Sequence, residues 1–407
     1  MTAPENGSTS RPRLALKKGE EKRLRAGHMW VFSNEVDTGK TPLKGLEPGE
    51  VVNLVDSAGK AVGSAMVNPG SLISARIFSR RPDTSLSENW LARRLEQAVG
   101  LRQSIHDKPY YRAIFAEADG LPGLILDRFD DVLVGQLNTA GMDRVRGELE
   151  KAIVRVLAPS ALLWRNDSGV RELEGLGRMI ETGFGTVPGH LKVIEQGLEF
   201  SIDPVAGQKT GWYFDQAANR ARVRPLIGQG DDVLDLYCYH GAWGLMAASS
   251  GAGQVTCIDA SEAAVDRVRI NARANGLESR VQARVADVEA WLEQCIAERR
   301  RFDTVIVDPP ALVKKARDVK PGLAKYRRIN ELALRVVNYG GLLATCSCSA
   351  HVREDVFADI LRKAARHVDR EIQILMRLEQ GPDHPVAPAI PETRYLKGLV
   401  VRVLPSY

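Results

Sequence analysis

Two cysteines stand two residues apart in the segment LLATCSCSAHV, at Cys346 and Cys348. The pair could be a metal clip, a disulfide, a nucleophile, or two small residues packed in a buried strand. The chain has 5 cysteines, and so sparse and odd a set argues against a disulfide framework and for reduced thiols. A metal site is disfavoured because there is no CxxC spacing and His351 is the one histidine nearby.

Four acidic residues follow four successive apolar runs in the second half of the chain: Asp235, Asp259, Asp287 and Asp308. A single aspartate after a strand is usually a helix cap. Four in register favour S-adenosylmethionine over NAD, because that ligand carries a sulfonium and an ammonium group. Asp259 would take the ribose hydroxyls, and Asp287 would lie on the adenine side. The turn with Gly241 and Gly244 is not a GxGxxG fingerprint, which suits a ligand without a pyrophosphate.

Asp308 is followed by two prolines, Pro309 and Pro310. Proline fixes φ and lacks a backbone donor, so this DPP segment predicts a stiff wall with free carbonyls. Such a wall suits a flat base that is flipped into a pocket and held by its exocyclic amine. Taken alone, the segment would more often be a turn that ends a strand.

A basic run comes directly after this predicted base pocket, opposed by a single acid, Asp318. Its members are Lys314, Lys315, Arg317, Lys320, Lys325, Arg327 and Arg328. A charged run is usually a solvated face, but this position favours contacts with phosphates. The net charge of +5 permits an anionic partner without requiring one.

The strand period of two places Cys346 and Cys348 on the same face, with Cys346 deeper in the apolar run and Cys348 at its polar end. Carbon 5 of cytosine does not take a methyl group from a sulfonium unaided. A thiolate that adds to carbon 6 makes an enamine whose carbon 5 can attack, and loss of the carbon-5 proton and the thiol restores aromaticity. Cys348, facing a base held by Asp308, is placed for that chemistry. Without the acidic neighbours, a buried structural cysteine would be the simpler interpretation.

These residues need a sheet that brings strand ends together. From Val233 onward, apolar runs alternate with segments of helical period, which predicts a mostly parallel, doubly wound α/β sheet of Rossmann-like type. Ligands bind beyond the carboxyl ends of strands in such sheets, so the four acids and Cys348 should share one edge.

The 407 residues are enough for two or three domains. We expect a disordered tail over residues 1–13, a small β-rich module over 14–82, a small α+β domain over 83–195 and the doubly wound domain over 196–407. No apolar run reaches ~18 residues, and the start of the chain has no apolar leader segment, so we expect a cytoplasmic protein without a membrane span.

The sequence resembles the RlmI-like 23S ribosomal RNA cytosine-5 methyltransferases over nearly its whole length. The stretches that carry the resemblance are LKKGEEKRLRAGHMWVFSNEV, AEADGLPGLILDRF, WRNDSGVRELEGL and GQKTGWYFDQAANR, followed by DPP and SCS. The first stretch looks like that family's PUA domain, which binds RNA. The resemblance implies a class I methyltransferase domain that uses S-adenosylmethionine to methylate carbon 5 of a cytosine in 23S ribosomal RNA.

By that resemblance, Cys348 occupies the position of the catalytic cysteine and Asp308 the base-binding motif. Thr210 and Asp215 fall on the segment that borders the cofactor and the target base. The expected cofactor contacts are Gln208, Tyr213, Asp235, Tyr237, Gly241, Asp259, Asp287 and Asp308. The expected RNA contacts are Lys209, Arg220, Pro309, Lys314, Lys315, Arg327 and Arg328.

The chain departs from the family pattern at two positions. His240 stands where the glycine turn commonly has a threonine, and we interpret it as a cap of the following helix. Ala311 stands where cytosine methyltransferases of the two-cysteine type carry a second thiol after DPP. Release of the enzyme from the base would then need another group to remove the carbon-5 proton.

Two other functions stay open at this point. An enzyme with the same cofactor could methylate an exocyclic amine in ribosomal RNA without a thiol. A non-catalytic RNA-binding factor for ribosome assembly could keep a vestigial methyltransferase fold, although the intact strand-end acids argue against it. Besides RNA, a second copy of the chain is a partner to consider.

Overall fold

The computed structural model describes residues 11–208 and 210–406, which fall into two compact units. The first unit holds residues 11–189, 208, 210 and 383–393, and the second holds 190–207, 211–382 and 394–406. Residues 1–10 of the predicted tail lie outside the described residues, whereas Arg13, also assigned to that tail, begins the first strand.

The first unit opens with a five-stranded sheet in the order β1-β3-β4-β5-β2. Its elements are β1 (Arg13–Ala15), α1 (Glu21–Arg25), β2 (Trp30–Phe32), β3 (Val51–Val55), β4 (Ala61–Val67) and β5 (Ile73–Ser79). Val52 and Leu54 are fully buried, and Asn53 between them is partly exposed, because alternate side chains of a strand face opposite sides. The predicted small β-rich module is confirmed.

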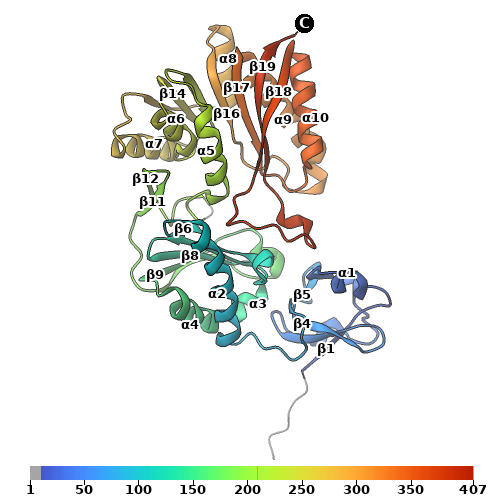
Figure 1. Ribbon diagram of the computed structural model, residues 1–407. Coiled ribbons are helices and arrows are strands. Elements are labelled where there is room, and N and C mark those ends of the chain that lie inside the picture. Colours follow the sequence, from blue (N-terminus) through green and yellow to red (C-terminus); the bar gives the residue numbers. More distant parts are fainter. Residues whose placement is uncertain (1–10, 209, 407) are drawn as a thin grey trace, which may run out of the picture. The chain divides into compact units, whose positions relative to one another are not determined.

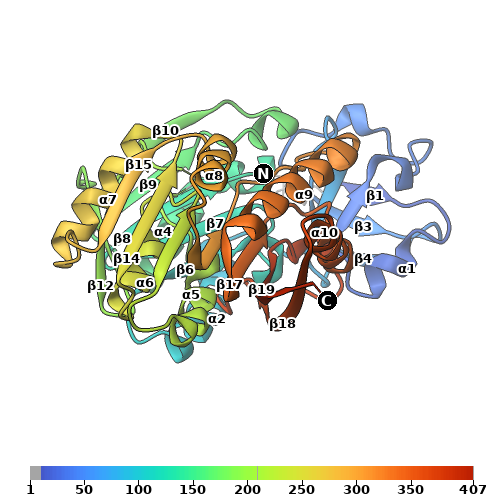
Figure 2. The ribbon, with the colours of Figure 1, turned by 90° about the horizontal axis from the view of Figure 1, so that it is seen from above.

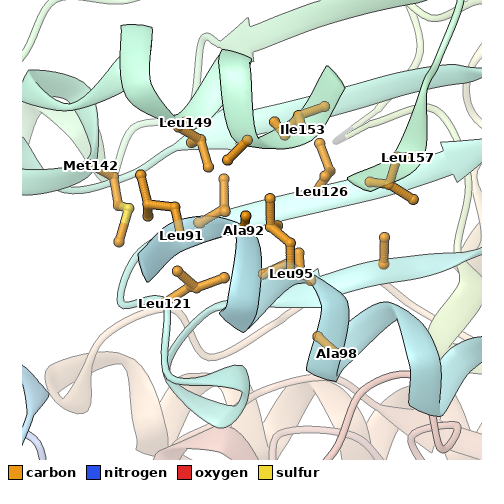
Figure 3. Close-up of a cluster of buried hydrophobic side chains, with 14 of the residues drawn as sticks. Leu91, Ala92, Leu95, Ala98, Leu121, Leu126, Met142, Leu149, Ile153 and Leu157 are labelled. Carbon is orange, nitrogen blue, oxygen red and sulfur yellow. The ribbon is translucent and has the colours of Figure 1, made fainter. Parts of the chain in front are cut away.

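A second five-stranded sheet, in the order β10-β9-β8-β7-β6, forms the rest of this unit. Its elements are α2 (Glu88–Ile105), β6 (Tyr110–Phe115), β7 (Leu124–Phe129), β8 (Val132–Leu137), α3 (Ala140–Arg144), α4 (Arg146–Leu157), β9 (Ala161–Asn166) and β10 (Met179–Phe184). Helix α2 begins after Ser87, whose side chain accepts a hydrogen bond from the Trp90 amide. Figure 3 shows Leu91 and Leu95 of α2 beside Leu149 and Ile153 of α4, in the apolar layer that covers the sheet. The predicted central α+β domain is confirmed.

The second unit begins with a hairpin of β11 (Leu191–Glu195) and β12 (Leu198–Ile202). The predicted boundary between residues 195 and 196 falls inside this hairpin, because the turn at Gln196 and Gly197 joins its two strands. The hairpin therefore belongs with the second unit and not with the central domain.

A seven-stranded sheet in the order β15-β14-β13-β16-β17-β19-β18 forms the core of the second unit. Its strands are β13 (Asp232–Leu236), β14 (Gln254–Asp259), β15 (Val281–Val285), β16 (Phe302–Val307), β17 (Val337–Ser347), β18 (Arg370–Glu379) and β19 (Lys397–Pro405). The first five are parallel, and β19 pairs antiparallel with β17 and β18. The predicted mostly parallel, doubly wound sheet is confirmed, with an antiparallel edge.

Helices cover this sheet on both faces (Figures 1 and 2). They are α5 (Ala217–Val223), α6 (Ala242–Ser249), α7 (Glu262–Ala274), α8 (Val288–Ala297), α9 (Val319–Val336) and α10 (Glu354–His367). Leu292 of α8, Ile329 of α9 and Leu361 of α10 pack in one apolar cluster with Leu234 and Leu236 of β13. Asp235, between those leucines, points to the opposite face, where it meets α6.

Candidate active site

The turn that follows β13 has an unusual backbone. Tyr237 and Tyr239 have φ angles of +60° and +48°, and Gly241 has a φ of +80°. Left-handed conformations are costly for residues with side chains and cluster at ligand-binding turns. Asp259, at the end of β14, holds the turn because its Oδ2 accepts a hydrogen bond from the Tyr239 amide at 3.0 Å.

Asp235 lies beneath this turn and is fully buried. Its Oδ2 accepts a hydrogen bond from the Gly244 amide at 2.8 Å, which fastens the first turn of α6 to β13. Among the described residues, no donor reaches its buried Oδ1. Burial disfavours the charged form and raises the pKa of Asp235 to about 8. Gly244 has to be glycine, because a Cβ there would lie 2.4 Å from the Cys257 sulfur.

The other two strand-end acids differ in exposure. Asp259 is half-buried, and its Oδ1 accepts a hydrogen bond from the Ser261 amide at 2.9 Å. Asp287 is exposed and caps α8, where its Oδ1 accepts from the Ala290 amide at 3.0 Å. Asp287 thus performs the common capping function of an aspartate after a strand, and its contact with a ligand stays a prediction.

The sequence predicted that His240 caps the following helix, and this prediction is wrong. Gly241 is the N-cap of α6, and no side chain there accepts a capping hydrogen bond. The His240 ring is buried and stacks on Tyr239 with 3.6 Å between ring centroids. Burial lowers its pKa to about 3, so the ring is neutral and serves packing.

Asp308 follows β16 and is held by two side chains that the sequence reasoning missed. Its Oδ1 accepts from Gln216 Nε2 at 2.9 Å, and its Oδ2 accepts from Trp243 Nε1 at 3.0 Å. Burial raises the pKa of Asp308 to about 6. Gln216 lies in the segment GQKTGWYFDQAANR, and Trp243 lies in the glycine turn, so both stood in stretches already singled out.

Cys348 comes one residue after the end of β17, next to the DPP segment. Its sulfur lies 3.8 Å from the carbonyl oxygen of Pro309. The Cys348 side chain is intermediate in exposure, whereas Cys346 is 1% exposed. Burial raises the pKa of the Cys346 thiol, which makes it a poor nucleophile. The predicted difference in depth between the two thiols is confirmed, and the catalytic role of Cys348 stays a prediction.

The two serines on either side of Cys348 are anchored to α9. The Ser347 hydroxyl donates to the Tyr326 hydroxyl at 2.9 Å, and Tyr326 is also 2.9 Å from Ser349 Oγ. Ser349 Oγ in turn accepts from the Val313 amide at 3.0 Å. This buried network joins the loop of Cys348 to the segment after DPP. Tyr326 lies within the basic run, and the charges of that run gave no indication of a buried tyrosine that positions the loop of Cys348.

Arg220 is not placed for the predicted RNA contact. Its side chain is 2% exposed and binds both carboxylate oxygens of Glu195, at 2.5 and 2.7 Å. Its guanidinium also lies 5.6 Å from the Trp212 ring centroid. Glu195 comes from β11, so this buried ion pair fastens α5 to the hairpin and leaves no cation for a phosphate.

The segment around residues 208–215 serves more than one purpose. Gln208 is exposed, and Lys209 lies outside the described residues. Thr210 is buried and its hydroxyl donates to Asp127 of β7, so it anchors the chain to the central domain, and its place beside a ligand stays a prediction. Tyr213 is half-buried, with its ring centroid 5.3 Å from that of Tyr239, and burial raises its pKa.

The basic run divides into two parts. Lys314 and Lys315 are exposed in the loop that leads to α9. Arg327 pairs with Glu331 at 2.7 Å, and Arg328 pairs with Glu293 at 2.5 Å. Pro309 is buried beside Cys348. Contacts of these residues with RNA stay predictions, and the lysines have the more accessible charges.

Residues 11–208 and 210–406 lack two features that mark other classes of protein. No helix in these ranges is long and apolar enough to cross a membrane. Nor do these ranges contain a group of three or more histidine, cysteine, aspartate or glutamate side chains arranged to hold a metal ion.

Two family models match the sequence. Residues 14–80 match a PUA-like domain, and residues 181–402 match the model described as S-adenosylmethionine-dependent methyltransferase. The second match spans more than half of the chain and includes every strand of the seven-stranded sheet except the last residues of β19.

Curated relatives and solved structures are similar over nearly the full length. The chain is 36% identical to "Ribosomal RNA large subunit methyltransferase I" of Shewanella denitrificans, over 96% of this chain and 99% of the relative. It is 37% identical to the protein of the same name from Erwinia tasmaniensis, with the same coverage. A solved structure from Streptococcus mutans, 19% identical, has the same fold and aligns with a TM-score of 0.81 over 96% of this chain and 99% of that one.

Proposed function

The chain belongs to the family of S-adenosylmethionine-dependent methyltransferases, and we propose that it methylates carbon 5 of a cytosine in the 23S RNA of the large ribosomal subunit, through a covalent adduct with Cys348. The name that the curated relatives share supports ribosomal RNA as the substrate. We choose carbon 5 as the methyl acceptor because of the half-exposed Cys348 thiol, which lies 3.8 Å from the Pro309 carbonyl at the end of β17.

The residues around the glycine turn fit S-adenosylmethionine. The left-handed turn from Tyr237 to Gly241 allows close approach of a ligand to the backbone, and Asp259 stands at the end of the next strand. The buried Oδ1 of Asp235 has no hydrogen-bond partner among the described residues, which is consistent with a ligand nearby. When bound, the cofactor supplies an electrophilic methyl group.

The chain's own residues would prepare the cytosine. Pro309 and Pro310 form a stiff edge, and the Asp308 carboxylate accepts a hydrogen bond from the exocyclic amine. A carboxylate has about four acceptor positions, so the bonds from Gln216 and Trp243 leave room for the base. The Cys348 thiolate adds to carbon 6 and makes carbon 5 nucleophilic. After methylation, the carbon-5 proton and the thiolate leave, and the ring is aromatic again.

RNA is the proposed partner. Support comes from the PUA-like domain at residues 14–80 and from the exposed Lys314 and Lys315 close to the proposed base pocket in sequence. The homodimer considered from the sequence stays a prediction, which light scattering on the purified protein tests.

The test measures transfer of a tritiated methyl group to ribosomal RNA by the wild type, Cys348→Ala and Cys346→Ala. We expect Cys348→Ala to lose more than about 1,000-fold in rate, because the nucleophile is gone, and to keep cofactor binding by calorimetry. Cys346→Ala is the matched control, since it removes a neighbouring thiol that faces the interior, and it should keep substantial activity.

Mass spectrometry of the digested RNA separates the remaining candidates. 5-Methylcytosine supports the proposal, whereas an N-methylated base would show that the exocyclic amine is the acceptor. Full activity of Cys348→Ala would refute the covalent route. A wild-type chain that binds RNA but fails to bind S-adenosylmethionine would point to an assembly factor.

A further inference from the structure

Lys397, at the start of β19, is a buried lysine with no role in the mechanism above. Its side chain is 6% exposed. The ammonium donates to the carbonyl of Ser349 at 2.5 Å and to the carbonyl of Val352 at 2.7 Å. Both carbonyls belong to the loop that begins with Cys348. Burying an ammonium is costly, so a lysine in this place needs compensation from its surroundings.

The sheet register explains how a residue so distant in sequence reaches the nucleophile. Lys397 pairs with Ser347 in the antiparallel ladder between β19 and β17. This pairing brings Lys397 to the end of β17, directly before the loop that begins with Cys348. The hydrogen bonds to the Ser349 and Val352 carbonyls then hold the ammonium against that loop.

The charges of the Lys397 and Cys348 side chains act on each other. Burial lowers the pKa of Lys397 to about 8, while a negative charge on Cys348 raises it and Arg394 lowers it. Arg394 is itself paired with Glu354, at 3.1 Å. A negative charge on Cys348 also raises the pKa values of Tyr213, Tyr326 and Cys346, and none of these side chains carries a positive charge. Lys397 is a cation whose charge acts with that of Cys348.

We propose that Lys397 is a positioning residue for Cys348: its ammonium clamps the loop after the nucleophile and stabilises the thiolate. The proposal rests on the proposed function, in which that thiolate attacks carbon 6. An ammonium has three protons, and carbonyls of the described residues accept two of them, so the third can face the sulfur. Cys348 gives its proton to solvent before the attack, and Lys397 keeps its own.

This arrangement answers a physical difficulty at the site. The nearby carboxylates of Asp308 and Asp215 act on the neighbouring Cys346 in the direction that opposes a negative sulfur. A thiolate at Cys348 needs a fixed positive charge to offset such fields. A helix terminus contributes only about half a charge, whereas a lysine on β19 can supply a whole charge.

The first experiment measures alkylation of Cys348 by iodoacetamide as a function of pH, with RNA and cofactor left out. Peptide mass spectrometry reads the Cys348 adduct between about pH 6 and pH 10 in the full chain. Lys397→Met should move the midpoint of the rate profile upward by about one pH unit, so alkylation near neutral pH slows about tenfold. Lys397→Arg should keep most of the wild-type profile. Lys363→Met, which removes an exposed lysine of α10, is the matched control and should change nothing.

The second experiment uses the reciprocal effect and does not depend on a Lys397 variant that folds. Cys348→Ala removes the negative charge that raises the pKa of Lys397, so the NMR titration of that ammonium should move to lower pH. An unchanged Lys397 titration would overturn the proposal. So would a Lys397→Met profile equal to that of the wild type, or a Lys397→Arg profile equal to that of Lys397→Met.

These results are separable from the test of function. If Cys348→Ala methylates RNA fully, the covalent route fails, while alkylation and titration still report whether Lys397 stabilises the thiolate. If Cys348→Ala is inactive and the alkylation profiles do not depend on Lys397, the covalent route stands and this proposal fails.

Discussion

The indole nitrogen of Trp243 donates to Oδ2 of Asp308 across 3.0 Å and joins the first turn of α6 to the end of β16. Trp243 is two residues after Gly241, in the turn proposed to bind the cofactor. Asp308 is the carboxylate proposed to hold the base. One hydrogen bond therefore links the two halves of the site, and the order of one half depends on the other.

The first prediction concerns the pH dependence of activity. The bond from Trp243 lowers the pKa of Asp308, against the larger effect of burial, which raises it to about 6. Trp243→Phe should therefore raise this pKa. Because a protonated Asp308 is a weaker acceptor for the exocyclic amine, the acid limb of kcat/KM should move upward by about one pH unit.

Rates of methyl transfer across the acid range check this shift. The matched control is Trp291→Phe, because the indole nitrogen of Trp291 is buried in the same domain without a hydrogen-bond partner among the described residues. Its acid limb should match that of the wild type. An acid limb of Trp243→Phe that stays in place would show that Asp308 does not bind the base as a carboxylate.

Local pattern was enough to predict the doubly wound sheet and the different depths of Cys346 and Cys348. Strand period and apolar runs report burial directly, so the end of β17 could be placed from the sequence. Pairing between distant side chains leaves no such pattern. Arg220 looked like an RNA contact because nothing in its own segment shows that Glu195 neutralises it.

Lys397 was missed for the same physical reason. In the segment YLKGLVVRV it is one polar residue at the start of an apolar strand, where a lysine usually points to solvent. The antiparallel register with β17, set by the whole sheet, brings it opposite Ser347, the residue before Cys348. Gln216 and Trp243 likewise became site residues through one contact each with Asp308.

The second prediction concerns stability. Arg220 and Glu195 form a buried ion pair, and removal of one partner leaves a buried charge without compensation. Arg220→Met should lower the free energy of unfolding by about 3 kcal/mol or more. Adding Glu195→Met should recover part of that loss, because the orphan carboxylate is gone.

Denaturant unfolding of both variants measures these changes. Arg222→Met, an exposed arginine of the same helix, is the control and should change stability by less than about 0.5 kcal/mol. If Arg220→Met is stable but binds RNA more weakly than the wild type, then Arg220 does contact RNA, as the sequence predicted.

The third prediction separates the two parts of the basic run. Lys314 and Lys315 are exposed, whereas Arg327 and Arg328 are paired with glutamates. If the lysines contact phosphates, the double variant Lys314→Ala, Lys315→Ala should reduce the slope of log affinity against log salt by about 1.4, since each contact with a single strand contributes about 0.7. Arg327→Ala should change the slope less.

Filter binding of a ribosomal RNA fragment at several salt concentrations gives both slopes. Equal slopes for wild type and double variant would show that these lysines do not contact the RNA.

The fourth prediction follows from the buried carboxyl of Asp235, whose pKa is raised to about 8 from an ordinary value of 3.8. In the unfolded chain this group loses its proton near pH 4, whereas in the folded chain it keeps the proton until about pH 8. Between these values the folded state binds one more proton, so the stability of the wild type should fall as pH rises, by up to about 1.4 kcal/mol per pH unit from this group.

Asp235→Asn cannot ionise and keeps an oxygen for the Gly244 amide, so its free energy of unfolding should fall less steeply between about pH 5 and pH 8. Denaturant titrations across this range give both slopes, with Asp287→Asn as the control because asparagine also caps a helix. Parallel slopes for wild type and Asp235→Asn would mean that Asp235 is ionised beneath the turn, and its buried Oδ1 would then carry a charge that a bound cation could neutralise.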